Sequence, residues 1–304
     1  MTVNRREFLY LSTAAIAALP LRSVSGALLQ PQAPATRFET IRRNVGYFTG
    51  RGGTIGWLVN PDAVAVVDSQ YPNTATICLD GLKEKSTRGV DLLFNTHHHG
   101  DHIGGNEVFR PATKRLVTHA RVPELATASA KGADAAPLKP DVTFDKTWSE
   151  SAGDERITAT HHGPAHTGGD AVIYFERANV AHMGDLLFHQ MHPFVDRAGG
   201  ASMQNWITTL QAVTKDLPAD ALYIAGHARQ GQPVVVTSKD VLRLRDYFDG
   251  VLSHTRAGLA QKRSKEEIST LESLKGFEEY AGSGTLLSLA SVVGVAYEEL
   301  TAAK

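Results

Sequence analysis

The sequence predicts an α/β protein in which two sheets pack against each other and helices flank them. Strand-like runs alternate with helical stretches along the chain, and the alternation forms two strand–helix halves. No internal repeat is visible at the level of sequence identity. The chain has 304 residues, of which 42% are hydrophobic, and this composition is sufficient for one domain with a sizeable core.

The first half begins with three strand-like runs, "RFETIRRNVGYFTG", "IGWLVN" and "AVAVVDS", separated by the turn sequences "GRGG" and "NPD". We expect these runs to form an antiparallel meander. A helix is expected over residues 73–86. The run "VDLLFNT" that follows is continuously apolar apart from its ends and Asp91, which is typical of a buried strand.

The second half repeats this alternation. Strands are expected at 115–119, 157–163, 171–176, 179–185 and 221–227. Helices are expected at 121–130, 203–215, 239–261 and 286–301, and a loop at 131–141. The last two helices form a C-terminal extension that starts at about residue 239.

Charge and cysteine content limit the function. The chain has 31 basic and 32 acidic residues, so no overall field attracts a nucleic acid or an anionic membrane. A small-molecule substrate is the expected partner, and no oligomeric state is predicted. Cys78 is the single cysteine, which excludes an intramolecular disulfide and a multi-cysteine zinc site. Nitrogen and oxygen atoms must therefore hold any bound metal.

The N-terminal stretch resembles a bacterial twin-arginine export signal. Arg5 and Arg6 precede the apolar stretch Leu11–Leu19, which is shorter than the roughly 20 residues of a membrane-spanning helix. An ordinary amphipathic helix is the alternative. We predict a signal peptide over 1–27 that engages the Tat translocase, and a mature domain over 28–304. The protein is then periplasmic or otherwise exported, without stable membrane insertion once the signal is removed.

The heptad "THHHGDH", residues 96–102, lies where the buried strand of the first half ends, and strand ends are where rigid scaffolds present functional groups. If the chain continues extended, His97 and His99 point to one side and His98 to the other. Two imidazoles on one side can hold a metal. Asp101 and His102 lie beyond a glycine bend and can turn towards a neighbouring position.

Three more candidate ligands lie in glycine-rich loops at strand ends. They are His166 in "GPAHTGGD", Asp185 in "AHMGDLLF" and His227 in "IAGHARQG". Glycine beside a ligand lets the backbone approach an ion closely. We expect this role of Gly163, Gly168, Gly184 and Gly226.

The ordered set His-x-His-x-Asp-His, His, Asp, His is similar to the ligand set of the metallo-β-lactamase-fold hydrolases, over about residues 37–227. The resemblance implies a four-layer αβ/βα sandwich with metals at one edge of the two sheets. It implies a first zinc ion held by His97, His99 and His166. It also implies a second zinc ion held by Asp101, His102 and His227, with Asp185 bridging the two. Iron and manganese also suit these ligands.

The chemistry implied by the resemblance is hydrolysis by a hydroxide shared between two metal ions, with Asp101 as the catalytic residue that orients it and accepts its proton. An ester, lactone, thioester or lactam is the expected substrate. The aspartate at position 185 resembles that of glyoxalase II-type thioesterases and lactonases, whereas true β-lactamases usually have cysteine or serine there. The resemblance therefore implies β-lactam hydrolysis as a side activity at most. His192 is expected to contact substrate or an oxyanion, and Trp57, Tyr71 and Phe194 to line the pocket.

Two alternatives belong to other functional classes. The resemblance also extends to persulfide dioxygenases, which hold a single iron with two histidines and an aspartate and consume oxygen. The other alternative is a non-catalytic metal-binding protein, although such a protein has no need of a complete second metal site. A nuclease is disfavoured by the near-neutral charge and the lack of a basic-aromatic run.

Overall fold

The computed structural model describes residues 35–130, 138–282 and 284–302. These residues belong to one compact unit, Pro34–Lys304. The other unit, Met1–Ala33, contains the predicted export signal and lies outside the described residues. Within the described ranges, no helix combines the length and the apolar character needed to cross a membrane.

A seven-stranded sheet forms the first half. Its strands, in spatial as well as chain order, are β1 (Arg37–Arg42), β2 (Val45–Thr49), β3 (Ile55–Val59), β4 (Val64–Val67), β5 (Val90–Asn95), β6 (Thr113–His119) and β7 (Val142–Phe144). Strands β1 to β4 pair in antiparallel fashion, which confirms the expected meander. Strands β4 to β7 pair in parallel. The helix α1 (Pro72–Lys85) supplies the crossover from β4 to β5 that a parallel pair requires.

A six-stranded sheet forms the second half, in the order β15-β13-β11-β10-β9-β8. Its strands are β8 (Thr147–Ala152), β9 (Glu155–Thr160), β10 (Val172–Phe175), β11 (Val180–His182), β13 (Leu222–Ile224) and β15 (Val235–Thr237). The helix α5 (Met203–Asp216) lies between the parallel pair β11 and β13 in the chain. A separate parallel pair is formed by β12 (Phe188–His189) and β14 (His227–Ala228).

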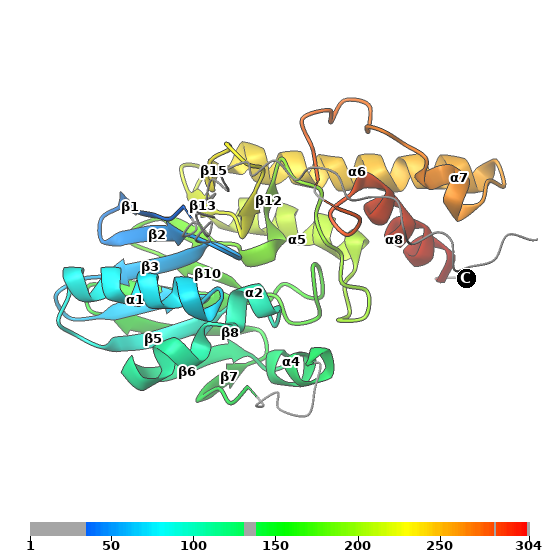
Figure 1. Ribbon diagram of the computed structural model, residues 1–304. Coiled ribbons are helices and arrows are strands. Elements are labelled where there is room, and N and C mark those ends of the chain that lie inside the picture. Colours follow the sequence, from blue (N-terminus) through cyan, green and yellow to red (C-terminus); the bar gives the residue numbers. More distant parts are fainter. Residues whose placement is uncertain (1–34, 131–137, 283, 303–304) are drawn as a thin grey trace, which may run out of the picture. The chain divides into compact units, whose positions relative to one another are not determined.

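Three apolar cores join four layers. One core combines residues of both sheets, such as Phe94 of β5 and Ile173 of β10, so the sheets pack face to face. A second joins the outer face of the first sheet to Leu79 of α1. A third joins the second sheet to Trp206 of α5 and Phe248 of α6 (Ser238–Ala260). Figure 1 shows α1 on one side and α5 and α6 on the other, and the four-layer αβ/βα sandwich is confirmed.

Short helices and turns occupy the edge of the sheets. They are α2 (Gly100–Ile103), α3 (Asn106–Phe109), η1 (Arg110–Ala112), α4 (Val122–Ser129) and the 3₁₀ turn η2 (Gly184–Leu186). The helix α2 begins directly after the three histidines of the heptad, and η2 directly follows β11. The loops that carry the candidate ligands therefore follow strands of both sheets.

The C-terminal extension is helical, as expected, and contains α6, α7 (Lys265–Ser269) and α8 (Leu289–Ala302). Glu299 of α8 accepts a hydrogen bond from Met203 N (2.8 Å) at the beginning of α5, where a carboxylate also complements the helix dipole. Between α7 and α8 the chain returns to the second half, where His192 N donates to Ala281 O (2.9 Å). These hydrogen bonds add to the packing of α6 in attaching the extension to the sandwich.

Candidate metal centre

The histidines of the heptad separate as their alternation predicts. His97 Nε2 lies 3.1 Å from His99 Nδ1, so these two rings converge. The ring of His98 points elsewhere, and its Nε2 lies 3.5 Å from Asp196 Oδ2. The heptad therefore presents its first and third histidines to one site.

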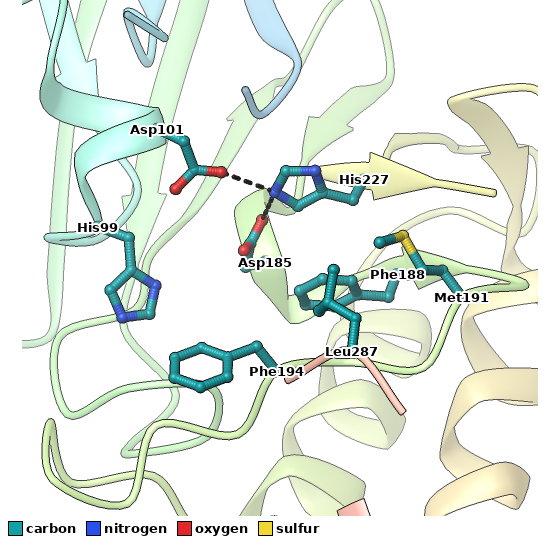
Figure 2. Close-up of a pocket in the computed structure, with 8 residues that line it drawn as sticks. All are labelled: His99, Asp101, Asp185, Phe188, Met191, Phe194, His227 and Leu287. Carbon is teal, nitrogen blue, oxygen red and sulfur yellow. Dashed lines mark ion pairs between the residues drawn. The ribbon is translucent and has the colours of Figure 1, made fainter. Parts of the chain in front are cut away.

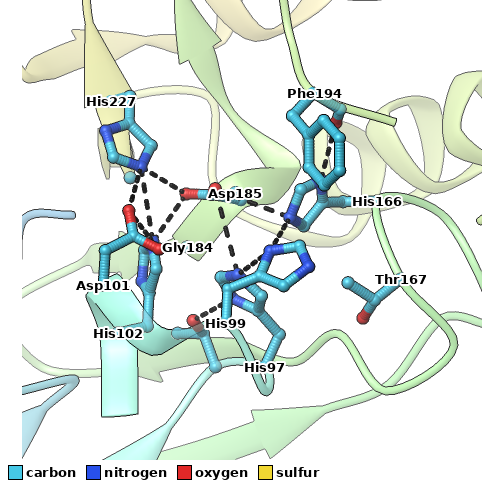
Figure 3. Close-up of polar contacts among 12 residues, drawn as sticks. His97, His99, Asp101, His102, His166, Thr167, Gly184, Asp185, Phe194 and His227 are labelled. Atoms are coloured by element: carbon cyan, nitrogen blue, oxygen red, sulfur yellow. Dashed lines mark hydrogen bonds and ion pairs between the residues drawn. The ribbon is translucent and has the colours of Figure 1, made fainter. Parts of the chain in front are cut away.

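A first cluster forms where the heptad meets the loop between β9 and β10 and the turn η2. His166 Nε2 lies 3.0 Å from His99 Nδ1. Asp185 Oδ2 lies 3.5 Å from His166 Nε2 and 3.9 Å from His97 Nε2. The four potential ligand atoms all lie within 4.8 Å of one another, which is a spacing that one cation can span (Figure 3).

A second cluster contains Asp101, His102 and His227. Asp101 Oδ2 lies 3.1 Å from His227 Nε2 and 3.7 Å from His102 Nε2. Asp185 Oδ1 faces this cluster, at 3.0 Å from His102 Nε2 and 3.4 Å from His227 Nε2. Asp185 thus directs one oxygen to each cluster, and the structure brings together all seven residues expected from the sequence.

Hydrogen bonds outside the first cluster fix which ring nitrogens carry protons. His166 Nδ1 donates to Phe194 O (2.8 Å), and His99 Nε2 donates to Asp196 Oδ2 (3.0 Å). A carbonyl and a carboxylate can only accept, so we assign the protons to these outer nitrogens. In the neutral rings, the inner nitrogens His166 Nε2 and His99 Nδ1 then carry the lone pairs.

The same reasoning applies to His97. Thr96 Oγ1 donates to Asp68 Oδ2 (2.8 Å) and therefore accepts from His97 Nδ1 (3.0 Å). His97 Nε2 is then unprotonated as well. Three lone pairs converge within hydrogen-bond distance without a proton between them, an arrangement that a cation would stabilise. The donor set of this cluster therefore fits a metal ion.

The charge states of the buried groups also fit a metal ion. Burial lowers the pKa of His166 to about 3 and that of His97 well below its usual value, so both rings are neutral. Burial opposes ionisation of Asp101 and Asp185, but the adjacent His102 lowers both pKa values, that of Asp101 to about 2. The carboxylates are therefore ionised.

The second cluster favours positive charge. Burial acts to lower the pKa of His102 and of His227, but the ionised Asp185 beside both rings raises each pKa, that of His227 to about 9. Asp68 and Asp101 act in the same direction on His102. Either protons on these rings or a cation can supply the charge that the carboxylates require.

Two carboxylates that the sequence did not indicate hold the imidazoles in place. Asp68, at the end of β4, accepts from His102 Nδ1 (2.7 Å), and Asp196 accepts from His99 Nε2. Such outer partners orient ligand rings and set their tautomers. The position of Asp68 directly after a buried strand was the available signal, whereas Asp196 lies in an irregular loop without one.

A third supporting carboxyl group, that of the buried Asp170, shapes the loop that presents His166. Its oxygens accept from Thr167 N (2.9 Å), Thr167 Oγ1 (2.6 Å) and Ala165 N (3.2 Å). Burial raises the pKa of Asp170 to about 7 in spite of these hydrogen bonds. Through its hydrogen bonds to Ala165 and Thr167, the carboxyl group positions the loop on both sides of His166.

The glycines beside the ligands lie where neighbouring protein groups leave no room for a side chain. A Cβ on Gly226 would lie 2.1 Å from Asp185 Oδ1. Gly184 has a φ of +49°, and a Cβ there would lie 2.4 Å from Thr96 Oγ1. At Gly163 and Gly168 a Cβ would meet Asn205 and Arg121. The expected close approach thus occurs between protein groups.

A cavity of about 230 Å³ opens beside both clusters. Its polar lining consists of His99, Asp101, Asp185 and His227, and its apolar lining of Phe188, Met191, Phe194 and Leu287 (Figure 2). Of the residues expected to line the pocket, Phe194 does so. A substrate placed here would contact groups of both clusters.

The other expected lining residues lie elsewhere. Trp57 is buried in the outer core and stacks on Phe38, with ring centroids 5.0 Å apart. Tyr71 precedes α1 and lies under Arg51. His192 lines a different cavity, and its Nδ1 is 2.8 Å from Tyr247 Oη. Apolar flanking residues do not distinguish a pocket from a core, so the contact of His192 with substrate stays a prediction.

The fold and the two clusters define a family of metal-dependent enzymes, and comparison with known proteins identifies it. A family model described as the metallo-beta-lactamase superfamily matches residues 48–227. The chain belongs to this superfamily. With the two His/Asp clusters, this confirms the prediction of a metallo-beta-lactamase superfamily hydrolase.

Curated relatives differ in activity. "Metallo-beta-lactamase type 2" of Elizabethkingia meningoseptica is 22% identical over 205 residues, which are 64% of this chain and 80% of that protein. A hydroxyacylglutathione hydrolase of Synechococcus sp. (strain JA-2-3B'a(2-13)) is 33% identical over 140 residues, which are 45% of this chain and 50% of that protein. The hydroxyacylglutathione hydrolase of Brucella abortus is 26% identical, over 61% of this chain and 66% of its own length. The chain thus spans less than two thirds of these two hydrolases.

Solved structures show the same fold. A metallo-beta-lactamase from Pontibacter korlensis has a TM-score of 0.60 and 18% identity, covering 71% of this chain and 99% of that one. The sec-alkylsulfatase Pisa1 from Pseudomonas sp. has a TM-score of 0.69 and 13% identity, covering 86% of this chain and 49% of that one. At these identities the likeness concerns the fold alone.

Proposed function

We propose that the protein is an exported dinuclear zinc hydrolase that cleaves an ester, lactone, thioester or lactam bond of a small molecule. The observation that supports this most directly is the convergence of three ring nitrogens that carry lone pairs in the neutral rings. His99 Nδ1 lies 3.1 Å from His97 Nε2 and 3.0 Å from His166 Nε2. Asp185 extends this site to Asp101, His102 and His227. Each cluster would hold one ion, with Asp185 between them.

Two zinc ions held in this way would acidify a water molecule and polarise the bond that it attacks. Asp101 is the catalytic residue of the proposal. Its side chain is 25% exposed and lines the cavity, and its low pKa keeps it ionised at neutral pH. The ionised carboxylate can therefore accept a hydrogen bond from the attacking water and orient it, and we propose the same group as the acceptor of the proton.

The arrangement also favours two metal ions over a single iron. A persulfide dioxygenase-like protein needs two histidines and one aspartate around one metal, whereas here a second set of three ligands lies next to the first. Metal analysis of protein purified without added metal distinguishes these possibilities. Two zinc ions per chain support the proposal, and one iron per chain with oxygen-dependent turnover would contradict it.

The activity is tested with nitrocefin, lactones, thioesters and aryl esters. Zinc-loaded wild-type protein is expected to hydrolyse at least one of these classes. Asp101→Ala and Asp185→Ala are expected to abolish the activity, while Asp62→Ala, which alters an exposed carboxylate on the turn before β4, retains it. Binding of two zinc ions without hydrolysis of any class would favour a non-catalytic metal-binding protein.

Export is supported by the paired arginines and the apolar stretch of residues 1–27. Expression of the full chain in a bacterium followed by fractionation tests it. Processed protein is expected in the periplasm, and changing Arg5 and Arg6 to lysine is expected to retain the unprocessed chain in the cytoplasm. Periplasmic protein from both the wild-type chain and the double-lysine variant would contradict the twin-arginine route.

A further inference from the structure

The cavity beside the two clusters has one polar and one apolar side. Phe188 belongs to β12, Met191 and Phe194 follow it in the chain, and Leu287 precedes α8. Figure 2 shows these four side chains next to one another, with Asp185 and His227 adjoining Phe188. A substrate with its reactive bond at the clusters would therefore place a neighbouring part of the molecule against this apolar wall.

Among the residues that the structure describes, no strongly basic side chain lines the cavity. None of the eight residues that line it is lysine or arginine. Of the arginines that follow lining residues in the chain, Arg197 donates to Ala201 O (2.7 Å) and Arg229 donates one nitrogen to Gln190 Oε1 (3.1 Å), while Arg229 Nε is buried without a hydrogen-bond partner; neither residue belongs to the lining. A carboxylate on the part of a substrate that contacts the wall would lose its hydration without gaining an ion pair.

The C-terminal extension holds Leu287 at the cavity. Ala281 pairs with Met191 and accepts a hydrogen bond from His192 N. Gly282 approaches Leu287 O so closely that a Cβ on it would overlap this oxygen. Ala281 is thus tied to the loop that carries Met191 and Phe194, and Leu287 lies close to the adjacent Gly282, which places Leu287 beside this loop.

We infer that the substrate is a neutral, compact ester or lactone whose aliphatic or aromatic part packs against this apolar wall. The inference rests on the proposed hydrolytic function and narrows its substrate class. The volume of about 230 Å³ is small compared with cavities for drug-sized ligands. A β-lactam or a glutathione thioester carries a carboxylate, and the wall offers no group to bind it. Leu287 is the specificity-determining residue contributed by the extension.

Hydrolysis of p-nitrophenyl acetate, propionate, butyrate and hemisuccinate by zinc-loaded protein tests the inference. Each added methylene is expected to raise kcat/KM about fourfold, which is the effect of burying one methylene group. The hemisuccinate is expected to react more slowly than the butyrate. Faster hydrolysis of the hemisuccinate, or no dependence on chain length, would overturn the inference.

Substitution of the wall supplies a matched comparison. Leu287→Ala is expected to reduce the chain-length dependence, whereas Leu286→Ala alters a neighbouring leucine that is 64% exposed and outside the cavity lining, and should leave it unchanged. Equal effects of the two variants would contradict the assignment of Leu287. Circular dichroism spectra establish that both variants are folded.

Binding separates this inference from the proposed function. Calorimetry of zinc-loaded protein with acetohydroxamate, propionohydroxamate and butyrohydroxamate measures contact with the wall without any bond cleavage. Affinity that rises with chain length in wild type but not in Leu287→Ala supports the wall even if no ester is hydrolysed, in which case the proposed function alone fails. Hydrolysis of esters without any chain-length dependence in rate or affinity leaves the function intact and refutes the wall.

Discussion

Asp68 is expected to contribute both to folding and to the second cluster. The residue is fully buried, and its carboxylate accepts hydrogen bonds from Thr96 N (2.8 Å), Thr96 Oγ1 (2.8 Å) and His102 Nδ1 (2.7 Å). Asp68→Ala leaves these three donors without an acceptor. A buried donor without a partner costs about 1–3 kcal/mol, so the free energy of unfolding should fall by about 3 kcal/mol or more.

Asp68→Asn provides a graded comparison. The amide oxygen can still accept from His102 and Thr96 Oγ1, but the amide nitrogen then faces Thr96 N, and the loss should be about 1–3 kcal/mol. Asp68→Ala also releases the ring of His102, and loss of such a partner typically weakens metal binding 10–100-fold. Removal of Asp68 should therefore weaken binding in the second cluster more than in the first.

Two measurements test these values. Urea denaturation of the metal-free protein, followed by tryptophan fluorescence, gives the free energy of unfolding. Competition with a chromophoric chelator gives the zinc affinity. Asp62→Ala serves as the control because its carboxylate is exposed, and it should stay within about 0.5 kcal/mol of wild type. The reasoning fails if Asp68→Ala matches this control in both stability and affinity.

Three further predictions concern the site and its support. Asp196→Ala should weaken only the metal site that contains His99, by roughly 10–100-fold, as monitored by absorption of the cobalt-substituted protein. Gly226→Ala should displace Asp185, whose Oδ1 would lie 2.1 Å from the new Cβ, and lower stability by about 1–3 kcal/mol in thermal unfolding; an unchanged metal content would contradict this. Burial and a neighbouring histidine lower the pKa of His119 to about 4. Stability should therefore fall as the pH decreases from about 6.5 towards 4, and less so in His119→Gln, as measured by urea titrations across this range.

The sequence predicted those parts of the site that depend on local pattern. Alternation along an extended chain separates His98 from His97 and His99, and strand-end positions bring the remaining candidate ligands to one edge. The supporting carboxylates were not predicted, because Asp68 and Asp196 act on rings 34 and 97 residues away along the chain. Partners of this kind are determined by how the loops pack, which a single sequence does not display.

The fold was predicted from the same alternation, but its details depend on long-range pairing. The strands β7 and β8 were not expected. The strand β8, "TWSESA", is mostly polar and lies at a sheet edge, where exposed residues alternate with partly buried ones, so it lacks the apolar alternation of a typical strand. The pocket lining was predicted least well. Phe194 and Trp57 are both aromatic residues, yet Phe194 lies in a loop and lines the cavity, whereas Trp57 lies in the middle of β3 and packs in the core.

The family match ends at residue 227, whereas Leu287 lies in the extension beyond it. The ligand residues and Leu287, which lines one side of the cavity, therefore belong to different segments of the chain. Exchange or mutation of the extension could alter which molecules are accepted while the ligand loops stay intact. Related proteins with the same ligand pattern but different C-terminal segments should accordingly differ in substrate more than in the reaction that they catalyse.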